Sequence, residues 1–240
     1  MIHQTYTKIN TLYKREKEGV LKNCIIPGDF SDKTTEYLQN CLWLCHEKVD
    51  GTNMSIYYDG HEIEIHGKSE NAMIHPKLMS HMRSLLTLER LAEVFPIKVD
   101  ENGDEALMTV RIYGEGFGGN IQGAAAKAYR PNGEFEFIVF DVSVNGKYLS
   151  RETVEDICGK LNLTAVPLIG IMTLPEAEEI VKKGFVSRVA IKDGFIAEGL
   201  VCRPLVPLLD ENGKRVLVKI KTRDYQQLEA KRQQLTKKKE

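Results

Sequence analysis

The sequence lacks the long apolar runs of membrane proteins, the disulfide framework of small secreted proteins and the strong positive charge of general nucleic-acid-binding proteins. No apolar run approaches the roughly 20 residues that cross a bilayer, and the opening residues, MIHQTY, hold no apolar signal core. The five cysteines are an odd number without a disulfide framework. A formal net charge of -1 predicts no general affinity for nucleic acid. We therefore expect a cytoplasmic protein that meets any polyanion through a local basic surface.

Zinc is disfavoured by the spacing of its possible ligands. Cys41, Cys45 and His46 lie close together, but no second ligand pair at metal spacing follows them. The two cysteines are predicted to be small buried hydrophobic residues, with a zinc site as the alternative.

What is present suits a globular protein. The 240 residues, 42% hydrophobic and 28% charged, are enough to bury a full core. Neither an internal repeat nor a flexible linker is visible, so one compact domain over residues 1–240 is expected. It ends in a mainly basic, helix-forming tail at about residues 223–240.

A polar heptapeptide, EKVDGTN at residues 47–53, lies between apolar segments at 42–44 and 54–58 that are typical of strands. It sets Lys48 between two carboxylates and follows them with a glycine, where a strand can deliver a side chain into a pocket and the chain can then turn sharply. The alternative is a charged surface turn. Residues 54–58, Asp59-Gly60 and the alternating residues 62–66 predict a hairpin directly after it.

The middle of the chain carries further candidates. A helix is predicted from Pro76, with apolar residues at helical spacing as far as residue 95. A strand at 107–113 leads into a glycine-rich turn at 114–119 that contains Glu115, a carboxylate placed for a hydroxyl or an ammonium group. Phe140, in an alternating strand at 134–142, either packs in the core or stacks on a base.

The last third predicts two capped helices and two strands. Ser150 caps one helix, and Thr173 caps the other in a capping box. Residues 195–201 place Glu198 inside an apolar strand, which is costly unless the acid is paired or faces a cation. Residues 215–221 follow an Asn-Gly hairpin and put Lys219 and Lys221 on one face; the alternative is the solvated side of an edge strand.

The order Lys-x-Asp-Gly at residues 48–51 resembles motif I of the covalent nucleotidyltransferases, the polynucleotide ligases and messenger-RNA capping enzymes. In these enzymes the lysine becomes linked to a nucleoside monophosphate. The chain as a whole is similar to the RNA ligase 2 family, because six motifs occur in that family's order. They lie at residues 47–53, 67–69, 114–115, 137–141, 198–199 and 219–221.

Two details favour the RNA ligases within that superfamily. DNA ligases and capping enzymes usually have an arginine shortly after the glycine, whereas Thr52-Asn53 stands here; residues 119–122, GNIQ, also resemble the RNA ligase branch. The resemblance implies a single α+β nucleotidyltransferase domain, built mostly of antiparallel sheets flanked by helices. It implies ATP, a divalent cation (Mg²⁺ or Mn²⁺), and RNA with 5′-phosphate and 3′-hydroxyl ends.

The resemblance also implies a role for each candidate residue. Lys48 would be the nucleophile, Lys219 and Lys221 would bind the α-phosphate, and Glu198 would bind the metal. Glu47 would contact the adenine amino group, with Asp50 and Asn53 completing the first motif, Lys68 and Glu115 holding the ribose or a phosphate, and Phe140 stacking on the base.

The implied reaction is ATP-dependent RNA ligation in three steps. A lysine attacks only as a neutral amine, and its ordinary pKa is about 10.4, so the chemistry needs neighbouring positive charge and partial desolvation. The alternatives are a minimal DNA ligase, separable with matched RNA and DNA nicks, and a non-catalytic nucleotide or RNA sensor, which would bind ATP without a covalent adduct.

Two departures from the family pattern stand out. Lys68 replaces the usual arginine and lacks its planar fork. The sequence also ends soon after Lys221, so we expect no C-terminal domain of the kind that helps such ligases to engage nicked duplexes, and a partner protein could replace it. The basic tail, with Lys231, Arg232 and residues 237–239, is predicted either to contact RNA or to be a solvated terminus.

Overall fold

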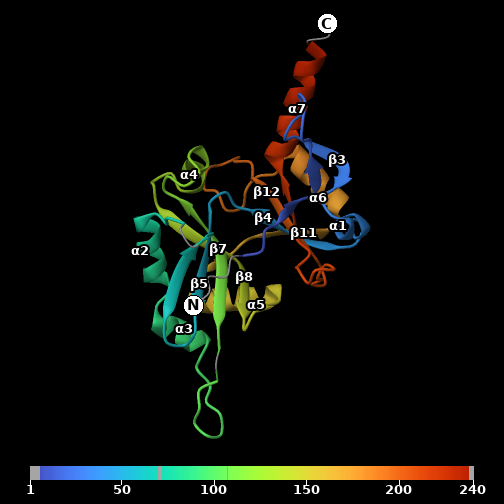
Figure 1. The fold of residues 1–240 in the computed structure, drawn as a ribbon. Helices are drawn as coiled ribbons and strands as arrows, with labels where there is room; N and C mark the ends of the chain where they lie inside the picture. The colour runs from blue at the N-terminus through green and yellow to red at the C-terminus, as the bar shows by residue number, and fades with distance from the viewer. Residues whose placement is uncertain (1–5, 70–71, 107, 238–240) are drawn as a thin grey trace. The chain divides into compact units, whose positions relative to one another are not determined.

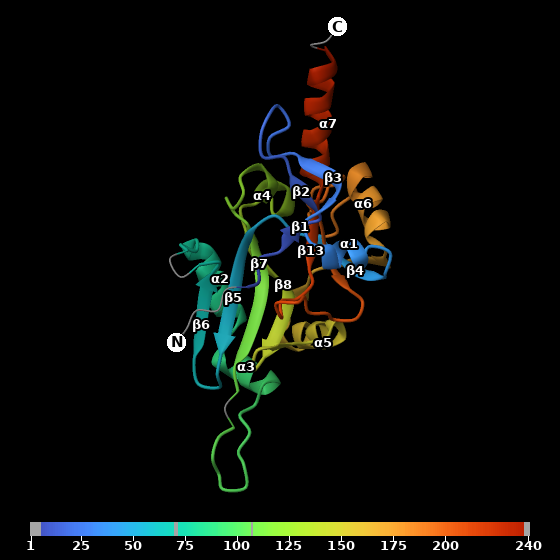
Figure 2. The ribbon, with the colours of Figure 1, turned by 45° about the vertical axis from the view of Figure 1, so that its right-hand side comes forward.

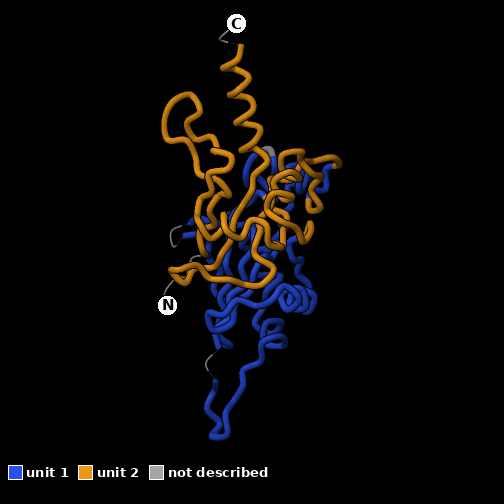
Figure 3. Tube along the Cα trace, turned by 90° about the vertical axis from the view of Figure 1, so that its right-hand side faces the viewer, with its two compact units in different colours: residues 1–6, 50–166, 190–192 blue, residues 7–49, 167–189, 193–240 orange. Residues whose placement is uncertain are grey.

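The computed structural model describes residues 6–69, 72–106 and 108–237. The chain divides into two compact units, each with its own sheet and core. Unit 1 comprises residues 1–6, 50–166 and 190–192, and unit 2 comprises residues 7–49, 167–189 and 193–240 (Figure 3). The expectation of one nucleotidyltransferase domain over residues 1–240 stays a prediction. Within the described ranges, no helix is long and apolar enough to span a membrane.

The mixed α+β architecture predicted from the sequence is confirmed, and most strand pairs are antiparallel. In unit 1 the strand order is β10-β8-β7-β5-β6, with β9 also paired to β8. Its central strands β5, β7 and β8 are labelled in Figure 1, and β6 beside β5 in Figure 2. The strands are β5 (Thr52–Tyr58), β6 (Ile63–Gly67), β7 (Val110–Gly118), β8 (Phe135–Val144), β9 (Lys147–Tyr148) and β10 (Thr164–Ala165). The pair of β10 with β8 is parallel, and the hairpin predicted around Asp59-Gly60 joins β5 to β6.

The core of unit 1 lies on one face of this sheet. Met54, Ile56 and Ile112 lie there among the buried residues, packed with residues of the helices. The helices of unit 1 are α2 (Pro76–Leu85), α3 (Leu88–Val94), α4 (Ala124–Tyr129) and α5 (Arg151–Leu161). Ser150 caps α5 as predicted, its side chain accepting from the Thr153 backbone N–H.

The prediction of one helix from Pro76 to about residue 95 is wrong, because the segment forms α2 and α3. Thr87 is an N-cap between them: its backbone is extended, and its hydroxyl oxygen accepts from the Arg90 backbone N–H at 3.4 Å. The apolar spacing survives the break because both helices pack against the same core.

The glycine-rich segment is also not the turn that the sequence suggested. β7 continues through it to Gly118, and the predicted first residue of this strand, Leu107, lies outside the described residues. A Cβ at Gly116 would lie 2.6 Å from a methyl carbon of Leu78 and 2.8 Å from the Met54 sulfur. The glycine therefore lets α2 pack closely against the sheet.

A bulge in β8 decides which way Phe140 points. Tyr113 pairs with Asp141 and Gly114 with Val139, so Phe140 is an extra residue opposite β7. The core residues are Val139 before the bulge and Val142 after it. Since side chains alternate along a strand, Phe140 and Asp141 both lie on the face away from the core.

Unit 2 holds the second sheet, with strand order β1-β13-β12-β4-β11. Its strands are β1 (Asn10–Thr11), β4 (Trp43–Lys48), β11 (Leu168–Met172), β12 (Gly199–Pro204) and β13 (Val218–Lys221), and β2 (Tyr13–Arg15) pairs with β3 (Ile25–Phe30) apart from them. The helices are α1 (Lys33–Tyr37), α6 (Leu174–Lys183) and α7 (Thr222–Lys237). The capping box predicted at Thr173 starts α6.

The core of unit 2 covers one face of this second sheet. Trp43, Cys45, Leu200 and Ile220 are fully or almost fully buried there. Cys45 is the small buried residue that was predicted, but Cys41 is exposed, because it lies in the loop before β4.

Two predictions about the end of the chain need correction. β13 is not an edge strand, because it pairs with both β1 and β12. Glu198 is not inside a strand, because β12 begins one residue later at Gly199, whose φ of +150° breaks the extended run. Of the predicted helical tail, the part up to Lys237 forms α7, and residues 238–240 lie outside the described residues.

Candidate active site

The two terminal lysines of β4 and β13 form a row with a glycine between them. Gly199 of β12 is the register partner of Lys48 on one side and of Lys221 on the other. Alternation from Cys45 and Ile220 puts both lysines on the face opposite the core. A Cβ at Gly199 would overlap the Ile220 carbonyl oxygen. This position therefore requires glycine, which also leaves no side chain between the lysines.

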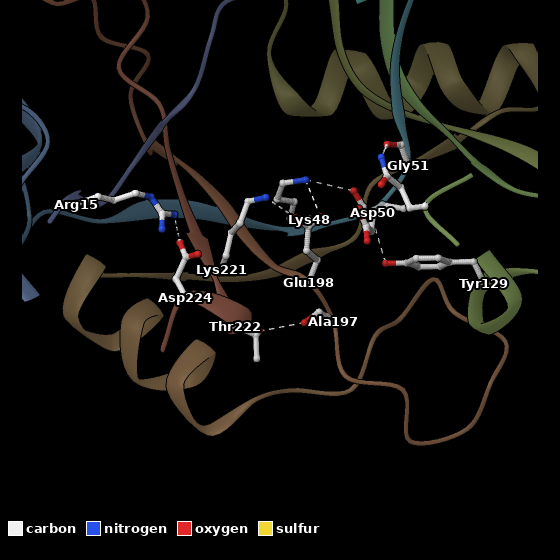
Figure 4. Close-up of polar contacts among 12 residues, drawn as sticks. Arg15, Lys48, Asp50, Gly51, Tyr129, Ala197, Glu198, Lys221, Thr222 and Asp224 are labelled. Atoms are coloured by element: carbon white, nitrogen blue, oxygen red, sulfur yellow. Dashed lines mark hydrogen bonds and ion pairs between the residues drawn. The ribbon is translucent and has the colours of Figure 1, made fainter. Parts of the chain in front are cut away.

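Glu198 connects the two lysines. Its Oε2 lies 2.7 Å from Lys48 Nζ, and its Oε1 lies 2.7 Å from Lys221 Nζ (Figure 4). The side chains are 9%, 20% and 12% exposed for Glu198, Lys48 and Lys221, so the cluster is largely withdrawn from water. The expectation that the buried acid meets cations is confirmed.

The charge state of Glu198 follows from two opposing effects. Burial alone raises the pKa of its carboxyl group, but the positive charges and hydrogen bonds of Lys48 and Lys221 outweigh that effect and hold the pKa below its ordinary value. The group is therefore a carboxylate at neutral pH. We call Lys48, Glu198 and Lys221 the lysine–glutamate cluster.

Lys219 lies one row further back on the same face. Val201 of β12 pairs with Lys219 on one side and with His46 on the other. The structure thus brings Lys48, Lys219 and Lys221 onto one face of unit 2. The alternation predicted this for Lys219 and Lys221. An anion above this face would meet several positive charges.

Glu47 points the other way and is held by two donors that the sequence did not suggest. Its carboxylate accepts from the Ser187 hydroxyl and, at 2.7 Å, from the Arg188 backbone N–H. The side chain is almost fully buried, and burial raises the pKa of this carboxyl group more than its hydrogen bonds and the charge of Arg188 lower it. The only signal in the sequence was general, because a strand acid facing inward must find donors.

The turn after the lysine is fixed within unit 1. The Asp50 backbone N–H donates to the Tyr129 hydroxyl at 3.2 Å (Figure 4), and the Gln122 side chain donates to the Gly51 carbonyl at 3.0 Å. A Cβ at Gly51 would overlap the Gly116 carbonyl oxygen and lie 2.9 Å from Cγ of Glu115. The motif I glycine is therefore required by its close approach to β7.

The other unit 1 candidates lie at one end of the first sheet. Asn53 is the register partner of Glu115, and both face away from the core. Lys68 directly follows Gly67, the partner of Met54, and its side chain is exposed. The structure thus makes Asn53 and Glu115 cross-strand neighbours, with Lys68 at the end of the adjoining edge strand.

Phe140 belongs to an aromatic group that reaches back to the N-terminus. The Tyr6 ring lies 4.9 Å from the Phe140 ring and 5.0 Å from the Tyr113 ring, and the Tyr6 hydroxyl donates to Asp141 at 2.6 Å. Tyr148 completes the group. Sequence reasoning missed Tyr6, because a lone tyrosine in a polar segment carries no pattern.

The residues present fit a divalent cation to which the protein supplies few of the ligands. The described residues contain no group of three or more Asp, Glu, His or Cys side chains arranged to hold a metal. Glu198 offers one carboxylate, and Mg²⁺ commonly binds through one or two carboxylates together with water and substrate phosphates. Because both Glu198 oxygens are bound by ammonium groups, a cation has to compete with Lys48 and Lys221 for them.

Comparison with known proteins places the chain in a family. The family model described as RNA ligase matches residues 42–221, well over half of the sequence. The chain belongs to the RNA ligase family. No curated protein sequence matches it.

Solved structures show the same fold. The RNA ligase of Naegleria gruberi, as a lysine-to-alanine variant with ATP and Mn, matches with a TM-score of 0.58 and 20% identity over 82% of this chain and 54% of that chain. A lysine-to-methionine variant with AMP and Mn gives 0.59 and 19% over the same shares. Another lysine-to-alanine variant with ATP and Mn gives 0.58 and 19% over 94% of this chain and 63% of that chain. The chain thus spans between half and two thirds of the length of these neighbours.

Proposed function

We propose that this RNA ligase family member is an ATP-dependent RNA ligase that joins 3′-hydroxyl and 5′-phosphate ends through an AMP covalently bound to Lys48. The observation that carries the proposal is the lysine–glutamate cluster. It holds the motif I lysine beside a second lysine and a buried carboxylate, in a chain of the RNA ligase family.

In the first step Lys48 Nζ, as a free amine, attacks the α-phosphorus of ATP. The N–P bond forms, the bond from phosphorus to the bridging oxygen breaks, and pyrophosphate leaves. Lys219 and Lys221 contribute positive charge on the face where the α-phosphate has to bind, which stabilises the charge that develops on its oxygens. A divalent cation held by Glu198 would add positive charge at the same phosphate.

The remaining steps move the AMP group to RNA and then release it. A 5′-phosphate oxygen of the RNA attacks the phosphorus of the lysyl-AMP, so the N–P bond breaks and Lys48 leaves as an amine. The 3′-hydroxyl oxygen then attacks the 5′-phosphate of the adenylylated end, a phosphodiester bond forms and AMP departs. Lys219 and Lys221 would stabilise all three steps, because charge develops on a phosphate group in every one of them.

The recognition roles remain part of the proposal. Asn53, Lys68 and Glu115 are assigned to the ribose or a phosphate, and Phe140 to the adenine ring. Glu47 can still accept from the adenine amino group, since a carboxylate has about four lone-pair sites and Ser187 and Arg188 occupy two of them.

The test is the intact mass of the protein after incubation with ATP and Mg²⁺. Wild-type protein is expected to gain one adenylate, and Lys48→Ala and Lys48→Arg to gain none, because neither side chain offers a free amine. Equal labelling of wild type and Lys48→Ala would remove Lys48 from the mechanism. GTP should label poorly; preferential labelling by GTP would favour a capping-type enzyme, and tight ATP binding without an adduct would favour a nucleotide sensor. Matched RNA and DNA nicks distinguish RNA from DNA ligation.

A further inference from the structure

The last helix of unit 2 is largely solvated beyond its first two turns. In α7, Thr222, Asp224 and Leu228 are buried, whereas most residues after Leu228 are exposed or half-buried. Figure 2 shows the helix running past the end of β13 alongside the loop that joins β2 to β3. A polar helix that extends from its own core is either a solvated end or a surface for a partner.

Side-chain contacts hold α7 in place, so the helix differs from a terminus that frays. Asp224, with a side chain only 6% exposed, lies 2.6 Å from an Arg15 guanidinium nitrogen. The Tyr225 hydroxyl donates to Glu178 of α6 at 3.2 Å. Further along, Lys231 Nζ donates to the Lys22 carbonyl at 2.8 Å. These contacts fix the direction of the helix against β2, α6 and the loop between β2 and β3.

The charges that α7 presents to solvent are mainly positive. Arg223, Arg232 and Lys237 are exposed, and Lys231 is half-buried at the loop contact. Glu229 is an exposed acid, whereas the charge of Asp224 is neutralised by Arg15. The exposed surface also carries amide donors that suit phosphate and sugar oxygens: Gln226, Gln227, Gln233 and Gln234.

We propose that α7 is a docked arm that binds the phosphate backbone of the RNA substrate. The inference rests on the proposed ligase function and adds to it where the polynucleotide is gripped. The formal net charge of the whole chain is -1, so attraction to RNA has to come from a local surface, and phosphate contacts by lysine and arginine supply such sequence-independent affinity. Arg223, Arg232 and Lys237 are the cations assigned to phosphate.

The experiment compares two triple variants of the full chain with the same change in charge. The first is Arg223→Gln, Arg232→Gln and Lys237→Gln, in which glutamine preserves helix propensity. The matched control replaces exposed lysines elsewhere in unit 2, as Lys33→Gln, Lys183→Gln and Lys214→Gln. The probe is a nicked RNA duplex with a 5′-phosphate and a 3′-deoxy end, which cannot be sealed. Its Kd is measured without ATP over a series of salt concentrations.

The α7 triple variant should lose about 2–3 units from the slope of log affinity against log salt, because each lost phosphate contact removes roughly 0.7–0.9 unit. The control should keep the wild-type slope. Equal slopes for wild type and the α7 variant, or equal losses in both triple variants, would overturn the proposal. Competition by polyglutamate as effective as competition by unlabelled RNA would overturn it in favour of an acidic protein partner.

A separate readout keeps the two proposals distinguishable. Both triple variants should form lysyl-AMP at the wild-type rate, because none of the six positions belongs to the lysine–glutamate cluster. Failure of wild-type protein to form the adduct would defeat the proposed function, while the salt slopes would still decide whether α7 binds RNA. Far-UV circular dichroism checks that α7 keeps its helix in the variant.

Discussion

In each sheet of this RNA ligase family member one face carries the core and the opposite face carries candidate site residues, but the two opposite faces differ in their chemistry. In unit 2 the face opposite the core is ionic, with Lys48, Lys219 and Lys221 on its strands and Glu198 bound to two of these lysines. In unit 1 the corresponding face carries the ring of Phe140 and a pair of neighbours, Asn53 and Glu115.

The difference teaches how each kind of face is specified. The ionic face is set by strand register, since the lysines meet only because Gly199 pairs with both of their strands. The aromatic face depends on an irregularity, because without the bulge Phe140 and Asp141 would lie on opposite faces of β8. We expect the ionic face to carry the covalent chemistry and the aromatic face to contribute recognition.

Among the substitutions that test this difference between the two faces, replacement of Glu198 should have the largest effect. Glu198→Ala leaves two ammonium groups largely buried without their carboxylate, so it should lower the adenylation rate by about 10²-fold or more and also destabilise the fold. Glu198→Gln keeps the shape and is the matched variant. Rates within a few-fold of wild type for both would show that the ionic face does not carry the chemistry.

The stability part of that effect has a defined pH dependence. The pKa of Glu198 is lowered on folding, so its contribution is present above the unfolded value, near 4.5, and is lost as the pH falls through the folded value. The free energy of unfolding of wild type should therefore exceed that of Glu198→Gln at neutral pH, and the gap should shrink in acid. A gap that does not change down to strongly acidic pH would contradict the pairing. Urea unfolding over a pH series measures it.

Lys221→Ala and Lys219→Ala should each slow adenylation strongly, by about 10²-fold if each contacts the phosphate. Lys221→Ala should also lower the melting temperature, because Lys221 is bound to the buried carboxylate of Glu198. Lys214→Ala, at an exposed loop position, is the control. Normal rates in both variants would mean that these lysines are merely solvated.

The smallest effect is expected on the aromatic face. Stacking on a base contributes roughly 1–3 kcal/mol, so Phe140→Ala should raise KM for ATP by about tenfold and leave kcat much less changed. Tyr6→Phe keeps the ring contact and removes the hydrogen bond to Asp141, which should cost about 0.5–1.5 kcal/mol of stability. If Phe140→Ala lowered kcat as much as Lys221→Ala does, the proposed division between a chemical face and a recognition face would be wrong.

Much of the site could be predicted because its signals are local. Residues 47–53 were predicted between two strands, and in the structure they join the end of β4 to the start of β5. The alternating residues 219–221 lie in β13. The capping residues Ser150 and Thr173 act within one helical turn, and both helices begin where these residues predict.

The rest depended on contacts between distant parts of the sequence. The helix predicted from Pro76 is interrupted at Thr87, whose hydroxyl oxygen caps the start of α3. Apolar spacing alone does not detect this interruption, because α2 and α3 pack against the same core. The glycine-rich end of β7 was interpreted as a turn, although Gly116 serves close packing against α2 and Gly114 serves close packing against Phe137 of β8. The donors of Glu47 at residues 187–188 lie about 140 positions away, beyond the reach of any local pattern.

The measurement that tests the central claim most directly is mapping of the adenylate by peptide mass spectrometry after incubation with ATP and Mg²⁺. The account predicts a single acid-labile AMP group on Lys48, absent from Lys48→Arg and strongly reduced in Glu198→Ala. An adenylate found on Lys219, on Lys221 or on a residue of unit 1, with Lys48 unmodified, would contradict the assignment of the covalent chemistry to the lysine–glutamate cluster.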